Sequence, residues 1–107
     1  MNKVFIINNS GHDYSKAEKY GKLVYLTKGQ VASYAANKSY REIADKMKDV
    51  TANDYILVTS LASLNCIAGW IIGYLRLPLN LLLYKDGKYI VRKMLPTLIY
   101  EEESLCD

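Results

Sequence analysis

Short, continuous apolar runs recur along the chain and alternate with stretches of helical pattern. Such runs are typical of strands buried on both faces of a parallel sheet. They predict strands over 3–8, 22–27, 55–59 and 79–84. Asp86-Gly87 then predicts a type I′ turn, because Asp-Gly tolerates positive φ, with an antiparallel return over 89–93. A short extended piece is expected at 98–100.

Three helices are predicted between the strands. A capping box from Ser15 to Glu18 predicts a short helix that ends at Gly21. A second capping box, from Ser39 to Glu42, predicts a helix to about residue 48, while 30–37 is ambiguous. The pattern from 61 to about 76 is apolar nearly all round and predicts a buried helix.

Strands that alternate with helices imply right-handed parallel crossovers and a layered α/β fold. We therefore predict a three-layer Rossmann-like sandwich with a mostly parallel sheet of about five strands. The expected strand order is 2-1-3-4-5, with the last strand antiparallel. At 107 residues the chain has the length of one domain, which we assign to 1–100, followed by an acidic tail at 101–107.

One segment admits a different interpretation. Residues 56–75 carry no charge over 20 positions, which meets the length of a membrane span. However, polar residues cluster in its first half, and β-branched residues give way there to helix formers. A buried strand followed by a buried helix is the better prediction.

The cysteines and the N-terminal pattern favour a cytosolic protein. Cys66 lies in an apolar run and is expected to be buried, and Cys106 is next to the last residue. Neither spacing indicates a disulfide framework or a zinc site, so no metal site and no cofactor are predicted. The N-terminal apolar run of four residues is too short for a signal peptide.

Charge is unevenly distributed. Residues 1–100 hold 14 basic and 7 acidic residues, and the tail adds four acids. A basic body attracts phosphates, nucleic acid or an acidic partner. An ordinary solvated surface explains the same charges equally well.

The candidate ligand site is the switch point between strands 1 and 3. In such sheets ligands bind beyond the carboxyl ends of the strands. Three polar loops should converge there, and the helix start after Ser15 offers N–H groups to a phosphate. The residues we expect to bind ligand are Asn8, Asn9, Ser10, Gly11, His12, Tyr14, Lys28, Thr59 and Ser60.

Structural explanations compete with this interpretation. Asn, Ser, Gly and Asp are ordinary turn residues. Ser60 can simply cap a helix, and Lys28 can be an ordinary surface lysine.

Catalysis is a weaker hypothesis. His12, the one histidine, is the candidate general acid or base of a phosphodiester- or nucleoside-cleaving enzyme. No nucleophile or second carboxylate stands at a diagnostic spacing. The first loop is neither a Walker A loop nor a GxGxxG fingerprint.

Ten tyrosines among many lysines also fit a module that binds nucleic acid or a protein partner. The helix at 61–76 has too little polar surface for an exposed position. Trp70 and Tyr74, beside Gly69 and Gly73, fit a homodimer seam, although the glycines could equally let the helix lie close to its own sheet. A dimer would bring two copies of the switch-point loops together, which suits a two-fold symmetric ligand.

The loop and first helix over 9–18, together with Tyr25-Leu26-Thr27 and the run over 80–84, resemble small phage-type Rossmann-like proteins. That resemblance implies the fold and no particular activity. The layout is also distantly similar to Rossmann-like domains that sense cyclic oligonucleotides in bacterial defence. We therefore expect a cytosolic, dimeric sensor or sequestering protein for a nucleotide-type or phosphorylated ligand.

Overall fold

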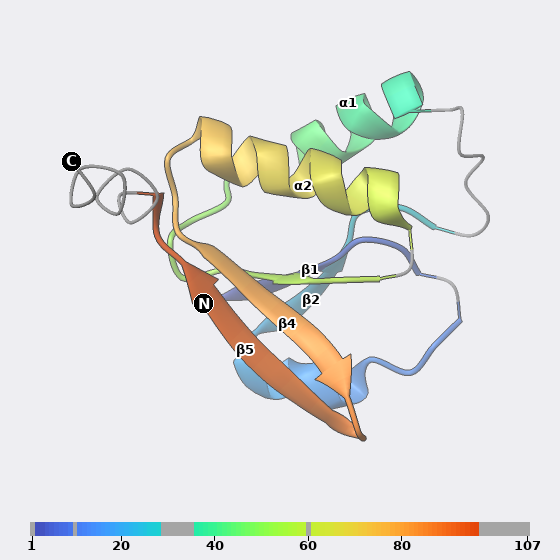
Figure 1. Cartoon of the computed structure of the whole chain (residues 1–107). Helices are drawn as coiled ribbons and strands as arrows, with labels where there is room; N and C mark the ends of the chain where they lie inside the picture. The colour runs from blue at the N-terminus through green and yellow to red at the C-terminus, as the bar shows by residue number, and fades with distance from the viewer. Residues whose placement is uncertain (1, 10, 29–35, 60, 97–107) are drawn as a thin grey trace.

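The computed structural model describes residues 2–9, 11–28, 36–59 and 61–96 (Figure 1). Its sheet has five strands in the order β2-β1-β3-β4-β5, which confirms the predicted order. All neighbours are parallel except β4 and β5, which are antiparallel. The strands are β1 (Lys3–Ile6), β2 (Lys22–Tyr25), β3 (Tyr55–Leu57), β4 (Leu79–Lys85) and β5 (Lys88–Met94).

Helices cover the two faces of the sheet unequally. Helices α1 (Ala36–Lys46) and α2 (Ala62–Tyr74) lie side by side on one face, and the 3₁₀ helix η1 (Ser15–Tyr20) lies on the other (Figure 1). Helix η1 has only six residues and packs on β1 and β2. Among the described residues, the layer opposite α1 and α2 is therefore thin, and the β4–β5 hairpin extends beyond it.

Strand β1 explains the continuous apolar runs. Phe5 and Ile7 pack in the core beneath α1 and α2, while Val4 and Ile6 pack in the core on the η1 side. Because successive side chains of a strand point to opposite faces, a strand covered on both sides needs apolar residues at every position.

The hairpin turn forms as predicted. Asp86 has φ 53° and Gly87 has φ 78°, and the strands pair up to Lys85 and Lys88 on either side of the turn. Two central residues with positive φ are characteristic of a type I′ turn, whose twist matches that of the strands.

Both predicted capping boxes are wrong. Tyr14 precedes η1 and makes no side-chain cap, and the backbone N–H of Ser15 donates instead to Asp13 Oδ1 at 2.9 Å. Helix α1 begins at Ala36, so Ser39 lies inside it and is buried. A Ser-x-x-Glu pattern marks a helix start only where the residues before the serine are not helical. In α1 the helix extends back from Ser39 to Ala36.

The third helix, predicted to be buried, is buried along one stripe only. Only Leu64, Ala68 and Ile72 of α2 are buried, whereas Trp70 is 62% exposed. Cys66, expected to be buried, is exposed as well. One stripe of the helix covers the sheet, and the opposite stripe faces solvent.

The uncharged segment 56–75 is divided between β3 and α2. Within the described ranges, no helix has the length and apolar character needed to cross a membrane. The extended piece expected at 98–100 lies outside the described residues.

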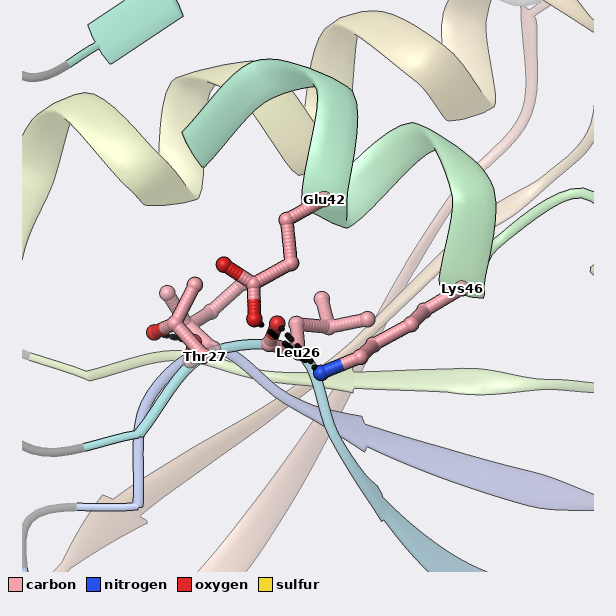
Figure 2. A network of polar contacts seen from close by, with 5 residues as sticks. Leu26, Thr27, Glu42 and Lys46 are labelled. Carbon is pink, nitrogen blue, oxygen red and sulfur yellow. Dashed lines mark hydrogen bonds and ion pairs between the residues drawn. The ribbon is translucent and has the colours of Figure 1, made fainter. Parts of the chain in front are cut away.

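Polar contacts hold α1 at the carboxyl ends of β1 and β2. Lys46 Nζ donates to the carbonyl oxygen of Leu26 at 3.1 Å and pairs with Glu42 Oε1 at 3.2 Å (Figure 2). Thr27 Oγ1 donates to the carbonyl oxygen of Ile7 at 2.7 Å. These bonds fix the geometry of the strand ends from which the candidate site is built.

The opposite end of the sheet is fixed by a buried polar cluster. Asp54 accepts hydrogen bonds from the backbone N–H groups of Lys3 and Thr51, at 2.9 and 2.8 Å. The Asn80 amide donates to the carbonyl oxygens of Ala52 and Asp54, both at 2.9 Å. This cluster ties β1, β3 and β4 together.

Candidate functional site

A cavity of about 540 Å³ lies on the η1 side of the sheet, at the carboxyl ends of β1, β3 and β4. Its size is within the range of about 300–1,000 Å³ that is usual for small-molecule sites. The loop after β1 forms one wall, the end of β3 forms the base, and the tip of the β4–β5 hairpin forms the other wall. The lining residues are His12, Asp13, Tyr14, Lys16, Leu57, Val58, Thr59, Tyr84 and Tyr89.

Local hydrogen bonds shape the wall that follows β1. Asn9 Oδ1 accepts from the N–H of Gly11 at 3.5 Å, and Asp13 Oδ1 accepts from the N–H of Ser15 at 2.9 Å. Gly11 adopts φ 95°, a conformation that favours glycine. The loop thus turns twice within a few residues and brings His12 and Asp13 to the cavity.

Asp13 changes the expected chemistry of the η1 start. Hydrogen bonds from the backbone and side chain of Ser15 lower the pKa of the Asp13 carboxyl, so this side chain is ionised at neutral pH. The N–H group that was expected to serve a phosphate is already taken by a carboxylate. Among the lining residues, Lys16 supplies a cationic side chain and His12 a ring that can donate a hydrogen bond.

Tyr14 packs beneath the loop that follows β1 and bonds to it. It is buried, and its hydroxyl donates to the carbonyl oxygen of Asn8 at 3.4 Å. Its ring centroid is 6.2 Å from those of His12 and Tyr25, with the imidazole edge-on. Aromatic pairs prefer such tilted geometries, and here they set the position of the imidazole.

The opposite wall is aromatic. Tyr84 and Tyr89 lie directly across from each other in the β4–β5 register, with ring centroids 5.2 Å apart. Tyr84 is 60% exposed. Burial raises the pKa of Tyr89, as do its neighbours, Tyr14 first, so its phenol is a neutral hydrogen-bonding group at neutral pH. The two ring planes are 67° apart, so a flat ligand can stack on one ring and meet the edge of the other while the hydroxyls bond its polar atoms.

Asn65 fixes the base of the cavity from α2. Its Oδ1 accepts from the N–H of Thr59 at 3.3 Å, and its Nδ2 donates to the carbonyl oxygen of Thr59 at 2.7 Å. The Thr59 hydroxyl accepts from the N–H of Leu61 at 3.5 Å. The turn between β3 and α2 is therefore held by side chains on both sides of it.

Only some of the residues predicted to bind ligand line the cavity. His12, Tyr14 and Thr59 come together in the cavity. Four others are outside its lining: Asn8, Asn9, Gly11 and Lys28. Ser10 and Ser60 lie outside the described residues.

The physical reason is the direction in which the loop leaves the sheet. The N–H of Asn9 donates to the carbonyl oxygen of Thr27 at 2.9 Å, and Asn9 pairs with Lys28 in a parallel bridge. The β1–β2 pairing thus continues beyond the two strands, and Lys28 is exposed on that side. The Asn8 side chain is buried beneath the loop.

The sequence analysis did not predict the cavity wall formed by Tyr84 and Tyr89, nor the cationic side chain of Lys16 in the lining. Tyr84 and Tyr89 flank the predicted Asp86-Gly87 turn at equal distance, which places them opposite each other. Together with the predicted strand order, that symmetry locates both rings at the carboxyl end of β4. Lys16 gave no such signal, because it lies in what was predicted as an ordinary helical turn.

Comparisons with known proteins agree with the phage-type resemblance. Neither the curated proteins nor the solved structures contain a match to this chain. The family model described as "Phage Pam3 gp32-like protein" matches residues 2–94, which covers every strand and helix described above. The chain therefore belongs to the Phage Pam3 gp32-like protein family.

Proposed function

We propose that the cavity binds a nucleotide-type or other phosphorylated small ligand, and that the protein acts as a sensor or sequestering protein. The observation that carries this proposal is one cavity of about 540 Å³ that joins an aromatic pair to a lysine and an imidazole at the carboxyl ends of the strands. That edge is where open α/β sheets bind ligands.

Each group has a role in this proposal. A base stacks on the exposed ring of Tyr84 and meets the edge of the Tyr89 ring, and such stacking contributes about 1–3 kcal/mol per base. Lys16 and His12 hold a phosphate opposite. The Asp13 carboxylate accepts a hydrogen bond from an amino or hydroxyl group of the ligand. Because Asp13 offsets the charge of Lys16, a ligand with one phosphate fits better than a polyphosphate.

Binding is tested by thermal denaturation and calorimetry with nucleosides and with nucleoside mono-, di- and triphosphates. At 100 times its dissociation constant a ligand stabilises by about 2.7 kcal/mol, which raises Tm by about 10 °C in a domain of this size. Lys16→Ala should weaken a phosphorylated ligand about 10- to 100-fold, the loss of one charge-assisted hydrogen bond.

Lys28→Ala is the matched control, since Lys28 is an exposed lysine outside the cavity lining. Tyr84→Ala should weaken nucleosides and nucleotides alike. No binding of any of these compounds, or equal losses from Lys16→Ala and Lys28→Ala, would refute the proposal.

A nucleic-acid-binding function is the second candidate, and a specific surface favours it. The β4–β5 hairpin carries four exposed cations, Lys85, Lys88, Arg92 and Lys93, of which Lys85 and Lys88 adjoin Tyr84 and Tyr89 along the chain. Lysines beside an exposed tyrosine can hold phosphates while a base stacks. Affinity for single-stranded DNA or RNA should then fall steeply with salt, whereas a ligand in the cavity should be less sensitive.

If the protein is instead an enzyme, His12 is the candidate general acid or base. His12→Ala must then abolish product formation from phosphodiester or nucleoside substrates.

A cytosolic location agrees with Cys66, which is a free thiol at the surface.

A further inference from the structure

The outer face of α2 carries an aromatic ridge in solvent. Trp70 is 62% exposed and Tyr74, one turn further on, is 79% exposed. Tyr40 of α1, itself 40% exposed, stacks on Trp70 with ring centroids 5.6 Å apart. A hollow of about 290 Å³ lies among these three rings and Ile71. Contiguous exposed apolar surface of this kind marks an interaction site.

Two glycines beside the ridge have no role within the described fold. A Cβ atom at Gly69 or Gly73 would meet no atom within 4 Å. The glycines therefore do not serve to bring α2 close to its own sheet, which was the competing explanation. Glycine is also a poor helix former, so its presence here costs stability. What the two positions create is a groove one turn long beside the ridge of Trp70 and Tyr74.

Charge distinguishes among occupants of this face. Helix α2 contains no charged residue over its 13 positions, while residues 1–100 hold 14 basic and 7 acidic residues. Two copies of so basic a body repel each other over most of their surface. Helix α2 is a place where they can meet with less of that repulsion, whereas a charged peptide or nucleic acid would find no ion-pair partner on α2 itself.

The exposed aromatic area on this face also favours a second copy of the chain as the occupant. If an aromatic side chain offers about 200 Å², the exposed parts of Tyr40, Trp70 and Tyr74 amount to roughly 350 Å² per copy. That is nearly half of the roughly 800 Å² that each partner of a standard interface buries. The backbone at the glycines and the exposed Leu75 add to this area.

We infer that a second copy of this chain docks on the α2 face, with the Trp70–Tyr74 ridge of each copy in the Gly69–Gly73 groove of the other. A ridge and a groove on one face are self-complementary across a two-fold axis. The ligand cavity opens on the opposite side of the sheet, where its lining residues Tyr14, Leu57 and Tyr89 belong to the η1-side core. This dimer keeps the two cavities apart, contrary to the expectation that they would share a symmetric ligand.

Sedimentation equilibrium between about 5 and 500 µM tests the inference. The mass of the wild type should rise from 12.2 kDa toward twice that value. Trp70→Ala and Gly69→Ala should each weaken association at least tenfold. Gly69→Ala is the sharper variant, because the added methyl group meets open space in the monomer and fills the groove in the dimer.

Val91→Ala is the control, since Val91 is an exposed apolar residue on the opposite face of the sheet, paired with Leu82. A monomer at 500 µM would overturn the inference. So would a dimer whose association is unchanged by both Trp70→Ala and Gly69→Ala, or is weakened equally by Val91→Ala. Denaturation of Gly69→Ala at about 1 µM should show a fold at least as stable as the wild type.

Discussion

Gly21 is the position where the smallest change should have the largest effect on the fold. It ends η1 and leads directly into β2. A Cβ atom here would stand 2.5 Å from the carbonyl oxygen of Asn2 and 2.7 Å from its carbonyl carbon. Those atoms belong to the backbone, so they cannot rotate away. The same carbonyl accepts the N–H of Lys22 at 2.9 Å, which begins the β1–β2 pairing.

The cost of Gly21→Ala follows from this geometry. Ordinary contacts of a Cβ atom are 3.4–4 Å, so the two segments must separate by about 1 Å. Overpacking of this kind costs about 1–3 kcal/mol, and the stretched hydrogen bond of Lys22 adds about 1 kcal/mol. The total of about 2–4 kcal/mol is a large part of the 5–15 kcal/mol that stabilises a typical domain.

Urea and thermal denaturation measure the effect. The midpoint in urea should fall by about 1 M or more, and Tm should fall by about 10–25 °C. Gly69→Ala at about 1 µM is the matched control: its methyl group meets no atom within 4 Å, and it should be neutral or up to about 1 kcal/mol stabilising. If Gly21→Ala unfolds within about 0.5 kcal/mol of the wild type, the steric argument is refuted.

Three further outcomes follow from polar groups of the structure. Asn80→Ala removes the donor to the carbonyl oxygens of Ala52 and Asp54 and should cost about 1–3 kcal/mol in urea denaturation; a cost near zero would show that water replaces the amide. Lys46→Met should cost about 1–3 kcal/mol in the same assay, because it removes the charged donor to the carbonyl oxygen of the buried Leu26 as well as the partly exposed ion pair with Glu42; a cost near zero would contradict this. Because burial raises the pKa of Tyr89, its contribution to stability is complete below pH 10.0 and is lost as pH rises through the folded-state pKa. The unfolding free energy of wild type should therefore fall more steeply than that of Tyr89→Phe above about pH 10, and equal slopes there would disprove the assignment.

The topology could be predicted because local signals agreed with it. The apolar runs identified the strands, and the Asp86-Gly87 turn identified the hairpin. Helix starts were less predictable. Ser15 and Ser39 both carry a capping pattern, but the cap at η1 is made by Asp13, and α1 begins three residues before Ser39. Capping residues compete locally, and small differences in loop geometry decide which of them is used.

The sequence predicted the location of the candidate site but only some of the residues that line it. The switch-point rule located the carboxyl ends of the strands, and His12, Tyr14 and Thr59 do line the cavity there. Lys28 fails to reach it because its segment keeps pairing with Asn9 along the edge of β1. No pattern within a single loop reveals which way that loop leaves the sheet.

The sequence by itself determined the strand order, the hairpin and the edge of the sheet at which polar loops gather. The strands and the hairpin follow from periodicity and turn chemistry over a few residues, and the strand order and the edge follow from the layered α/β fold that alternating strands and helices imply. Tertiary structure alone decided that the cavity pairs the first loop with Tyr84 and Tyr89, which are some 70 residues away along the chain. It also decided that one stripe of α2 covers the sheet and leaves Trp70 in solvent, because burial depends on how many layers the chain can supply.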